Sequence, residues 1–221
     1  MEKILKSVTM LLLLVMILGS FMYYLNPALY NTTIQEDALI ENITALTLLA
    51  ISMFLLFRLI KVGSSKNIEW IIFNIFLILT LFFGFGEEIS WGQRIFSIES
   101  NEYFSENNLQ GETNIHNLKL FGLKINEVVF TYVLGLIFGF YIFISSYIFK
   151  KNQYFKNIVN RYGIPLPRMH HSIAFVLATL IITTIPHSRV WERWECFNVL
   201  LLFMIFLQPY NINEKLIPTK N

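Results

Sequence analysis

The sequence predicts an all-α integral membrane protein, a bundle of about six transmembrane helices with both termini on the cytoplasmic side. Hydrophobic residues fill 55% of the 221 positions and charged residues only 14%, whereas about 25% of a typical soluble domain is charged. Six apolar runs approach the roughly 20 residues that a helix needs to cross a bilayer. The length suits a single helical domain over residues 1–221, with no separate soluble domain.

The six runs follow one another along the chain, and the last two are short enough to form a tight hairpin. The first run also fits a signal peptide, since Lys3 and Lys6 precede it. Its apolar residues continue to Leu25 without a small-residue cleavage site, which favours a retained helix. The predicted spans are Val8–Leu25, Ile43–Ile60, Trp70–Phe85, Val128–Phe149, Ser172–Pro186 and Phe197–Leu207.

Charge segregates between the two sides of this bundle. Five of the 17 basic residues fall on the far side from the N-terminus, so 12 lie on the N-terminal side, whereas 12 of the 15 acidic residues lie on the far side. Because basic loops stay in the cytoplasm, both termini are predicted to be cytoplasmic. The localisation that follows is the cell membrane, as a multi-pass protein.

The charges also limit the partners. They lie at the membrane edges, so there is no basic face for nucleic acid, and we expect membrane lipids and a lipid-linked substrate as partners. Cys196 is the one cysteine, which excludes an internal disulfide and a cysteine-based metal site.

The longest outer connection, residues 87–127, opens with a charged motif at the end of the third span. Glu87 and Glu88 end an apolar helix, and Trp91, Gln93 and Arg94 follow. Ionisable groups at a membrane boundary are costly unless they face water, a cavity or a partner. If the helix continues, Trp91 shares a face with both glutamates. The alternative is that the glutamates are the wet end of a span and that Trp91 belongs to an aromatic belt.

A second motif follows in the same connection, at Gln110–Asn117. Glu112 and His116 stand four residues apart, so a helical turn would place them on one face. That spacing suits a shared metal ion, or a carboxylate that orients an imidazole as a base. A solvated loop helix is the alternative interpretation.

The third polar segment is the short turn Ile185–Glu195, which carries His187, Arg189 and Arg193. The two arginines suit lipid phosphates, or they pair with the neighbouring glutamates. Trp191 and Trp194 are typical interfacial anchors.

All three segments are predicted to lie on the outer side, where they can form one pocket. Carboxylates and imidazoles suit acid–base chemistry and also suit a divalent ion such as zinc, manganese or iron. The sequence does not choose between these. The predicted catalytic residues are Glu87, Glu88, Glu112, His116 and His187, of which Glu112, His116 and His187 are the candidate metal ligands. The predicted substrate-binding residues are Trp91, Gln93, Arg94, Asn114, Arg189 and Arg193.

The strings Gly86–Arg94 and Gln110–Asn117 resemble a family of bacterial multipass membrane proteins with the motifs GEExSWGQR and QGETNxHN. The resemblance implies bacterial origin, and with it a place in the bacterial inner membrane, and it implies shared use of these residues. It assigns no reaction.

Three function hypotheses follow. The first is a membrane-embedded hydrolase or transferase that acts on a lipid or lipid-linked substrate at the outer face. The second is a non-enzymatic assembly or interaction subunit. The third, a small transporter, is disfavoured because the middles of the spans carry almost no charge. Whether the chain is an enzyme stays open at this level.

Overall fold

Apolar helices dominate the computed structural model of the chain, which describes residues 2–35, 38–125, 128–129 and 133–211. About 75% of it is helical, with almost no sheet. The α-helices are α1 (Glu2–Leu25), α2 (Pro27–Ile34), α3 (Leu39–Val62), α4 (Ile68–Glu88), α5 (Glu102–Asn107), α6 (Leu134–Phe140), α7 (Ser146–Lys151), α8 (Gln153–Tyr162), α9 (Met169–Ile182) and α10 (Val190–Leu207). The shorter elements are the 3₁₀-helices η1 (Gly63–Ser65) and η2 (Ser90–Gly92), the π-helix η4 (Tyr141–Ser145), and the antiparallel strands β1 (Lys119–Leu120) and β2 (Leu123–Lys124).

Four helical stretches of the described chain are long and apolar enough to cross a membrane. They are Ser7–Leu25, Pro27–Ser65, Ile68–Glu88 and Leu134–Lys151. Two further helices coincide with predicted spans without meeting that standard. The helix α9 has 14 residues, and α10 has 18 but carries three charged residues in its first two turns. The prediction of an all-helical chain is confirmed, and four helical stretches of the described residues have the length and composition to span a membrane.

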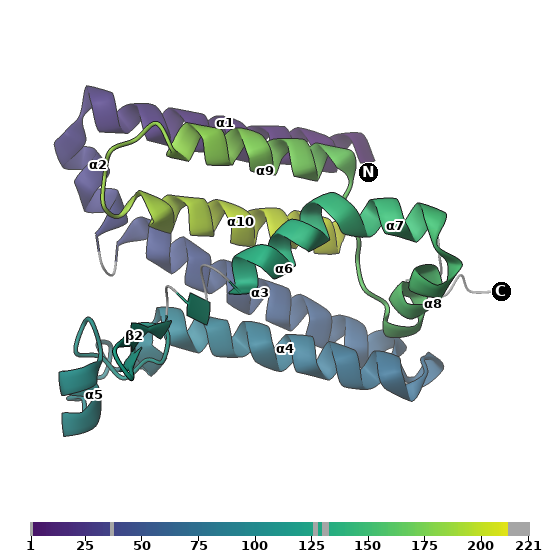
Figure 1. Cartoon of the computed structure of the whole chain (residues 1–221), viewed down its shortest axis with the longest axis horizontal. Coiled ribbons are helices and arrows are strands. Elements are labelled where there is room, and N and C mark those ends of the chain that lie inside the picture. Colours follow the sequence, from purple (N-terminus) through teal and green to yellow (C-terminus); the bar gives the residue numbers. More distant parts are fainter. Residues whose placement is uncertain (1, 36–37, 126–127, 130–132, 212–221) are drawn as a thin grey trace.

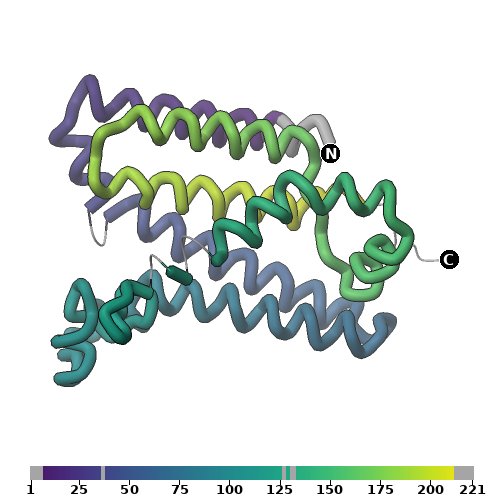
Figure 2. The backbone as a smooth tube through the Cα atoms, in the orientation of Figure 1, coloured from purple at the N-terminus to yellow at the C-terminus, as the bar shows by residue number. Residues whose placement is uncertain are grey.

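The long helices lie lengthwise beside one another (Figure 1). α1 packs on α9, α9 on α10, α10 on α3, and α3 on α4, whereas α6 runs obliquely across the bundle and joins α7 through η4. The connections that carry α2, α5 and the β-hairpin lie together, and we call this the loop end of the bundle. The described chain begins and ends at the opposite end, which we call the terminal end (Figure 2).

Two apolar clusters hold the bundle together. One lies among α1, α2, α9 and α10, where Ala174 and Ala178 are buried and let the helices approach closely. The other lies among α3, α4 and α10, where the Ser52 hydroxyl donates a hydrogen bond to the Ile78 carbonyl oxygen at 3.0 Å. Small residues and interhelical hydrogen bonds are the usual means of packing helices in lipid, since lipid tails are as apolar as the helices themselves.

Asparagines set several helix boundaries. The side chains of Asn26, Asn67, Asn101 and Asn152 cap α2, α4, α5 and α8, each accepting a hydrogen bond from a backbone N–H of the first turn. Gly163 ends α8 in the left-handed conformation. The predicted connection from Asn26 to Asn42 is therefore not a plain loop, because it contains α2 and the start of α3.

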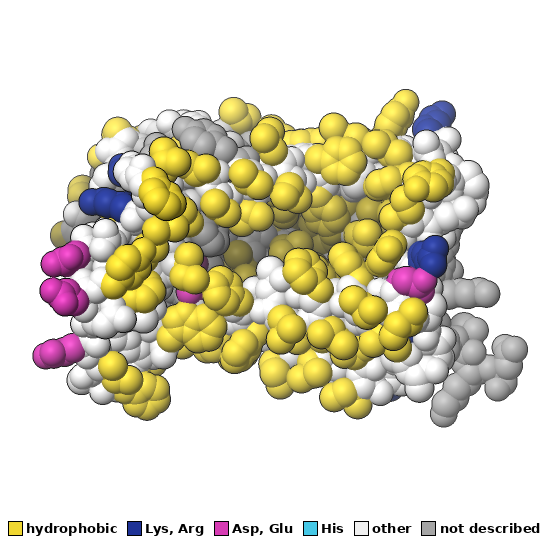
Figure 3. Space-filling model, turned by 60° about the horizontal axis from the view of Figure 1, so that its bottom comes forward, with side chains coloured by type: hydrophobic (Ala, Val, Ile, Leu, Met, Phe, Trp, Pro, Cys, Tyr) yellow, Lys and Arg dark blue, Asp and Glu magenta, His cyan; other side chains and the backbone are white. Residues whose placement is uncertain are grey.

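The surface has the polarity of a membrane protein. Hydrophobic side chains cover the middle of the face in Figure 3, and charged side chains gather at its two ends. Large apolar residues stay exposed along α1, α3, α4 and α6. Lipid tails covering this band would satisfy it, since the helices already satisfy their own backbone.

The arrangement predicts that the two ends of the bundle label from opposite sides of the membrane. Cys196 is buried, so single cysteines introduced at exposed positions can be read separately. We expect a membrane-impermeant maleimide to label Glu106→Cys, at the loop end, in intact cells. Gln153→Cys, at the terminal end, should label only after permeabilisation. Labelling of both variants in intact cells would contradict a bundle that spans the membrane.

Candidate functional site

The two sequence motifs fold into one hydrogen-bonded unit at the loop end, centred on Glu87. The Glu87 side chain is only 3% exposed. Its Oε2 accepts hydrogen bonds from the backbone N–H groups of Ile115 at 2.6 Å and His116 at 2.9 Å. Its Oε1 accepts one from the Trp91 indole at 2.8 Å. A carboxylate at a membrane boundary is thus satisfied by three donors, two of them from the second motif.

The connection between the motifs starts with a left-handed turn. α4 ends at Glu88, and Ser90, Trp91 and Gly92 have φ values of 45°, 54° and 77°. The helix does not continue to Trp91, so the condition for a shared helical face is not met, and Trp91 reaches Glu87 because the chain folds back. The absence of a side chain at Gly86 admits the indole, since a Cβ there would lie 2.7 Å from the Trp91 ring. Positive φ values are strained for Ser and Trp, and such strain clusters at functional sites.

The second motif is a loop held by asparagines, so the predicted helical turn at Gln110–Asn117 is wrong. Asn114 is 1% exposed. Its Oδ1 accepts a hydrogen bond from Asn108 Nδ2 at 2.8 Å, and its Nδ2 donates to Ser90 Oγ at 2.9 Å. Asn108 Oδ1 in turn accepts from the backbone N–H groups of Gln110 and Glu112. The predicted substrate-binding residue Asn114 is therefore part of the framework of the loop.

Glu112 and His116 have different partners in this loop. Glu112 accepts a short hydrogen bond from Ser90 Oγ and forms an ion pair with Arg94, with Nη1 3.0 Å from Oε1. His116 lies against Glu87, with Nδ1 3.7 Å from Oε2. Asn117 Nδ2 lies 2.9 Å from His116 Nε2. The His116 imidazole therefore lies between the Glu87 carboxylate and the Asn117 amide. The carboxylate beside the His116 imidazole is thus Glu87, whereas the four-residue spacing in the sequence indicates Glu112.

Gln93 fastens the two motifs a second time. Its Oε1 accepts a hydrogen bond from the Thr113 backbone N–H at 2.7 Å, and its Nε2 donates to Ser100 Oγ at 2.6 Å. Both ends of its amide are used within the loop, so Gln93 positions backbone.

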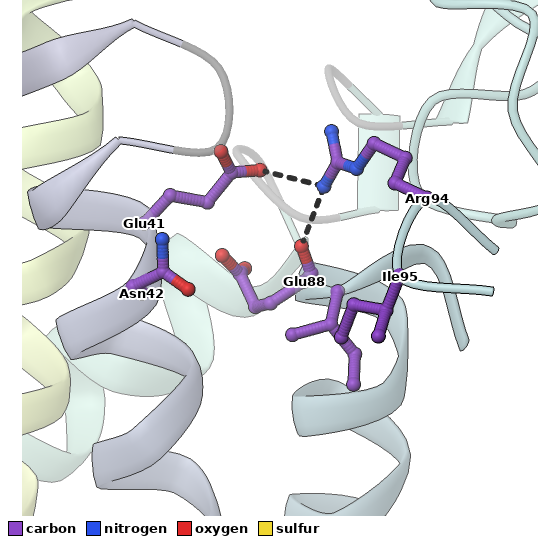
Figure 4. A pocket seen from close by; sticks show the side chains of 6 residues that line it. Glu41, Asn42, Glu88, Arg94 and Ile95 are labelled. Atoms are coloured by element: carbon purple, nitrogen blue, oxygen red, sulfur yellow. Dashed lines mark hydrogen bonds and ion pairs between the residues drawn. The ribbon is translucent and has the colours of Figure 1, made fainter. Parts of the chain in front are cut away.

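Glu88 faces the other way, into a small pocket between α3 and the end of α4 (Figure 4). Arg94 lies above it, with Nη2 3.8 Å from Glu41 Oε1 and 3.5 Å from the Glu88 carbonyl oxygen. The Glu88 carboxyl interacts electrostatically with those of Glu41, Glu192 and Glu195. The pocket, of about 60 Å³, is lined by Glu41, Asn42, Glu88, Ile89, Arg94 and Ile95.

Sequence analysis missed Glu41 and Glu195 as members of this site. The usable signal was the excess of acidic residues on one side, which predicted that carboxylates from several connections meet. The start of α10 also lies near the outer loop, because Glu195 interacts electrostatically with His116 of the second motif. Four carboxylates and one arginine thus come from α3, α4, α10 and the outer loop.

The third predicted segment forms a separate cluster. The His187 ring packs edge-on against Tyr23 and Tyr30, with centroids 6.2 and 5.6 Å apart, and its Nδ1 accepts a hydrogen bond from the Arg189 backbone N–H at 3.1 Å. Arg193 lies over the Tyr30 ring. Around α10, Arg193 points about 200° away from Glu195. The prediction of one pocket that includes His187, Arg189 and Arg193 is therefore wrong.

The predicted metal site does not form within the described chain. No group of three His, Cys, Asp or Glu side chains there is placed to hold a metal ion. Glu112 is bound by Ser90 and Arg94, His116 by Glu87 and Asn117, and His187 by the tyrosines and the Arg189 backbone. The donors predicted for a divalent ion thus have other partners, and no reaction step is derived through a metal.

Glu87 should be a structural residue. In Glu87→Gln one oxygen becomes an N–H₂ group that cannot accept, and the remaining hydrogen bonds lose their charge. We expect a loss of about 2 kcal/mol in the free energy of unfolding, read as a lower melting temperature in detergent and faster proteolysis within residues 95–120. The exposed Glu99→Gln is the matched control. Unchanged proteolysis of Glu87→Gln would show that the carboxylate does not hold the loop.

Comparisons of the chain with protein-family models, with curated proteins and with solved structures find no match. The family resemblance of the two motifs stays a prediction, and the contacts described above are what bears on function.

Proposed function

We propose that this chain is a membrane-embedded enzyme, a hydrolase or transferase, that acts on a lipid or lipid-linked substrate at the outer face. The observation that carries the proposal is that two adjacent glutamates, Glu87 and Glu88, have different contacts. Glu87 is committed to three hydrogen bonds within the loop, whereas the Glu88 carboxyl points into the pocket beside Arg94 and Glu41. Two neighbouring carboxyl groups in different surroundings, one hydrogen-bonded and one in a small pocket, match the pattern in which environment gives carboxyl groups different roles.

The roles follow from the chemistry of the lining. Glu88 accepts a proton from the attacking water or hydroxyl as its oxygen bonds to the reacting carbon or phosphorus atom. The proton that Glu88 has accepted then passes from Glu88 to the leaving oxygen. Arg94 holds a negatively charged group of the substrate with its planar guanidinium.

The size of the pocket favours a lipid as substrate. About 60 Å³ holds a reacting group and little more, so the rest of the substrate must lie outside. The face in Figure 3 is hollowed near its centre, and hydrophobic side chains surround the hollow. An acyl or isoprenoid chain fits such a surface, whereas a polar metabolite does not.

The proposal includes the topology. Six helical segments cross the membrane of a bacterial cell: α1, α3, α4, the segment from α6 to α7, α9 and α10. The loop end faces outward, and the termini are cytoplasmic. The parallel packing of α9 and α10 with α1 and α3 supports six spans. Polar residues at the start of α10 would then lie at the outer boundary, where charged groups are tolerated.

The second candidate is a non-enzymatic assembly or interaction subunit, which one observation favours. The outer loop exposes a group of large apolar side chains, namely Ile95, Phe96, Ile98, Phe121 and Leu123. Exposed apolar groups of this kind mark contact surfaces. A docking subunit would tolerate loss of Glu88 and would lose its partner when Phe96 and Phe121 are replaced.

Glu88→Gln separates the two functions. The protein is reconstituted in vesicles of bacterial lipid extract, and lipid composition is followed by mass spectrometry. We expect wild type to convert a lipid and Glu88→Gln to do so about 10²–10⁴-fold more slowly, with an unchanged melting temperature. Glu106→Gln, on the exposed part of the loop, should keep wild-type turnover. Equal turnover by Glu88→Gln would remove Glu88 from the mechanism.

A further inference from the structure

Arg193 is a buried cation at the loop end, on the far side of α10 from the Glu88 pocket. Its side chain is 7% exposed. The guanidinium carbon lies 5.5 Å from the centre of the Tyr30 ring. Gly19 in α1 makes room for it, because a Cβ there would lie 1.7 Å from Arg193 Nη2. Three elements, α1, α2 and α10, thus enclose one guanidinium group.

One N–H group of this guanidinium has no acceptor in the described chain. Arg193 Nε is enclosed and has no hydrogen-bond partner. The groups that interact with Arg193 electrostatically are Tyr30 and Cys196, and neither is a carboxylate. A buried charge left without a partner is strongly destabilising.

Tyr30, beside Arg193, is a second buried side chain with an unbonded polar group. The side chain is 0% exposed, and its hydroxyl has no hydrogen-bond partner in the described chain. The hydroxyl and Arg193 interact electrostatically, and the guanidinium lies over the ring that carries the hydroxyl. Most buried polar groups in proteins are hydrogen-bonded, and those that are not need an explanation. Here both orphaned groups are donors, and what they lack is an oxygen acceptor with negative charge.

The surrounding residues supply walls and no acceptor. Tyr23 packs edge-on against Tyr30, and the His187 ring packs against both. The His187 Nδ1 already accepts from the Arg189 backbone. On α10, Glu195 lies about 200° around the helix from Arg193, on the side of the Glu88 pocket.

We propose that Arg193 and Tyr30 bind a phosphate oxyanion, with the aromatic rings of Tyr23 and His187 beside it. A guanidinium binds phosphate through two parallel N–H donors, and the Tyr30 hydroxyl adds a third. The site lies at the end of the bundle where lipid head groups would lie. A lipid phosphate and free phosphate share this chemistry. The site does not depend on the proposed reaction, because Glu88 is on the other side of α10.

The test measures the melting temperature of the full chain in a non-ionic detergent. The probes are dihexanoyl phosphatidic acid, dihexanoylglycerol without the phosphate, and inorganic phosphate. Phosphatidic acid should raise the melting temperature of wild type, and dihexanoylglycerol should not. An equal rise with inorganic phosphate supports a free anion, and a rise with the lipid alone supports a head group. A rise with dihexanoylglycerol as large as with phosphatidic acid overturns the site.

Two tyrosines provide a matched pair of variants. Tyr30→Phe removes a hydroxyl without a partner, so the ligand-free protein should keep its melting temperature while its affinity for phosphatidic acid falls about 5–10-fold. Tyr24→Phe removes a hydroxyl that donates to the Thr184 carbonyl oxygen at 2.6 Å. It should lower the melting temperature and leave the affinity unchanged. Equal affinity in Tyr30→Phe and wild type overturns the role of Tyr30.

Arg193→Met tests the charge itself. It should abolish the effect of phosphatidic acid without lowering the melting temperature of the ligand-free protein, because an apolar side chain replaces an uncompensated cation. A wild-type response in Arg193→Met overturns the proposal. Glu88→Gln should respond to phosphatidic acid as wild type does, so failure of the catalytic proposal and failure of this one can be told apart.

Discussion

The loop end depends on the Glu87 carboxylate and the three N–H groups that bind it. Glu87 closes an apolar helix at the depth where water gives way to hydrocarbon, so its charge needs donors from the protein. The Ile115 and His116 backbones supply two of them, and this requirement brings a segment 28 residues away back onto the helix end. The turn at Ser90–Gly92, with positive φ at all three residues, ends the helix and still leaves the Trp91 indole bonded to the same carboxylate.

Because Glu87 is bound to the outer loop, the next residue, Glu88, points in a different direction. Adjacent residues on a helix point about 100° apart, so fixing Glu87 toward the loop turns Glu88 toward α3. Arg94 joins the two halves, because one side of its guanidinium contacts Glu112 in the loop and the other contacts Glu41 at the pocket. The position of Arg94 in the pocket lining is therefore set in part by its contact with Glu112, which is not a lining residue.

Much of the fold could be predicted from the sequence, and the site only in part. Apolar runs located α1, α3 and α4 because hydrocarbon thickness fixes their length. The start of α10 was placed at Phe197 and lies at Val190, because charged residues interrupt the apolar pattern while the helix continues. Because these first turns belong to α10, Arg193 and Glu195 lie on opposite faces of one helix. The four-residue spacing also predicts a common helical face for Glu112 and His116. The loop has an irregular backbone there, because asparagine side chains bind its backbone groups and one another.

The bridge between Asn108 and Leu118 closes the second motif into a loop with its own internal bonds. Gln93 and Thr113 join it to the first motif. The helix α5 between them, Glu102–Asn107, carries none of the bonds that join the two motifs, whereas Ser100 just before it contacts both Gln93 and Thr113. The length of α5 is thermodynamically cheap to change, so homologous chains are free to gain or lose residues there while both motifs keep their register.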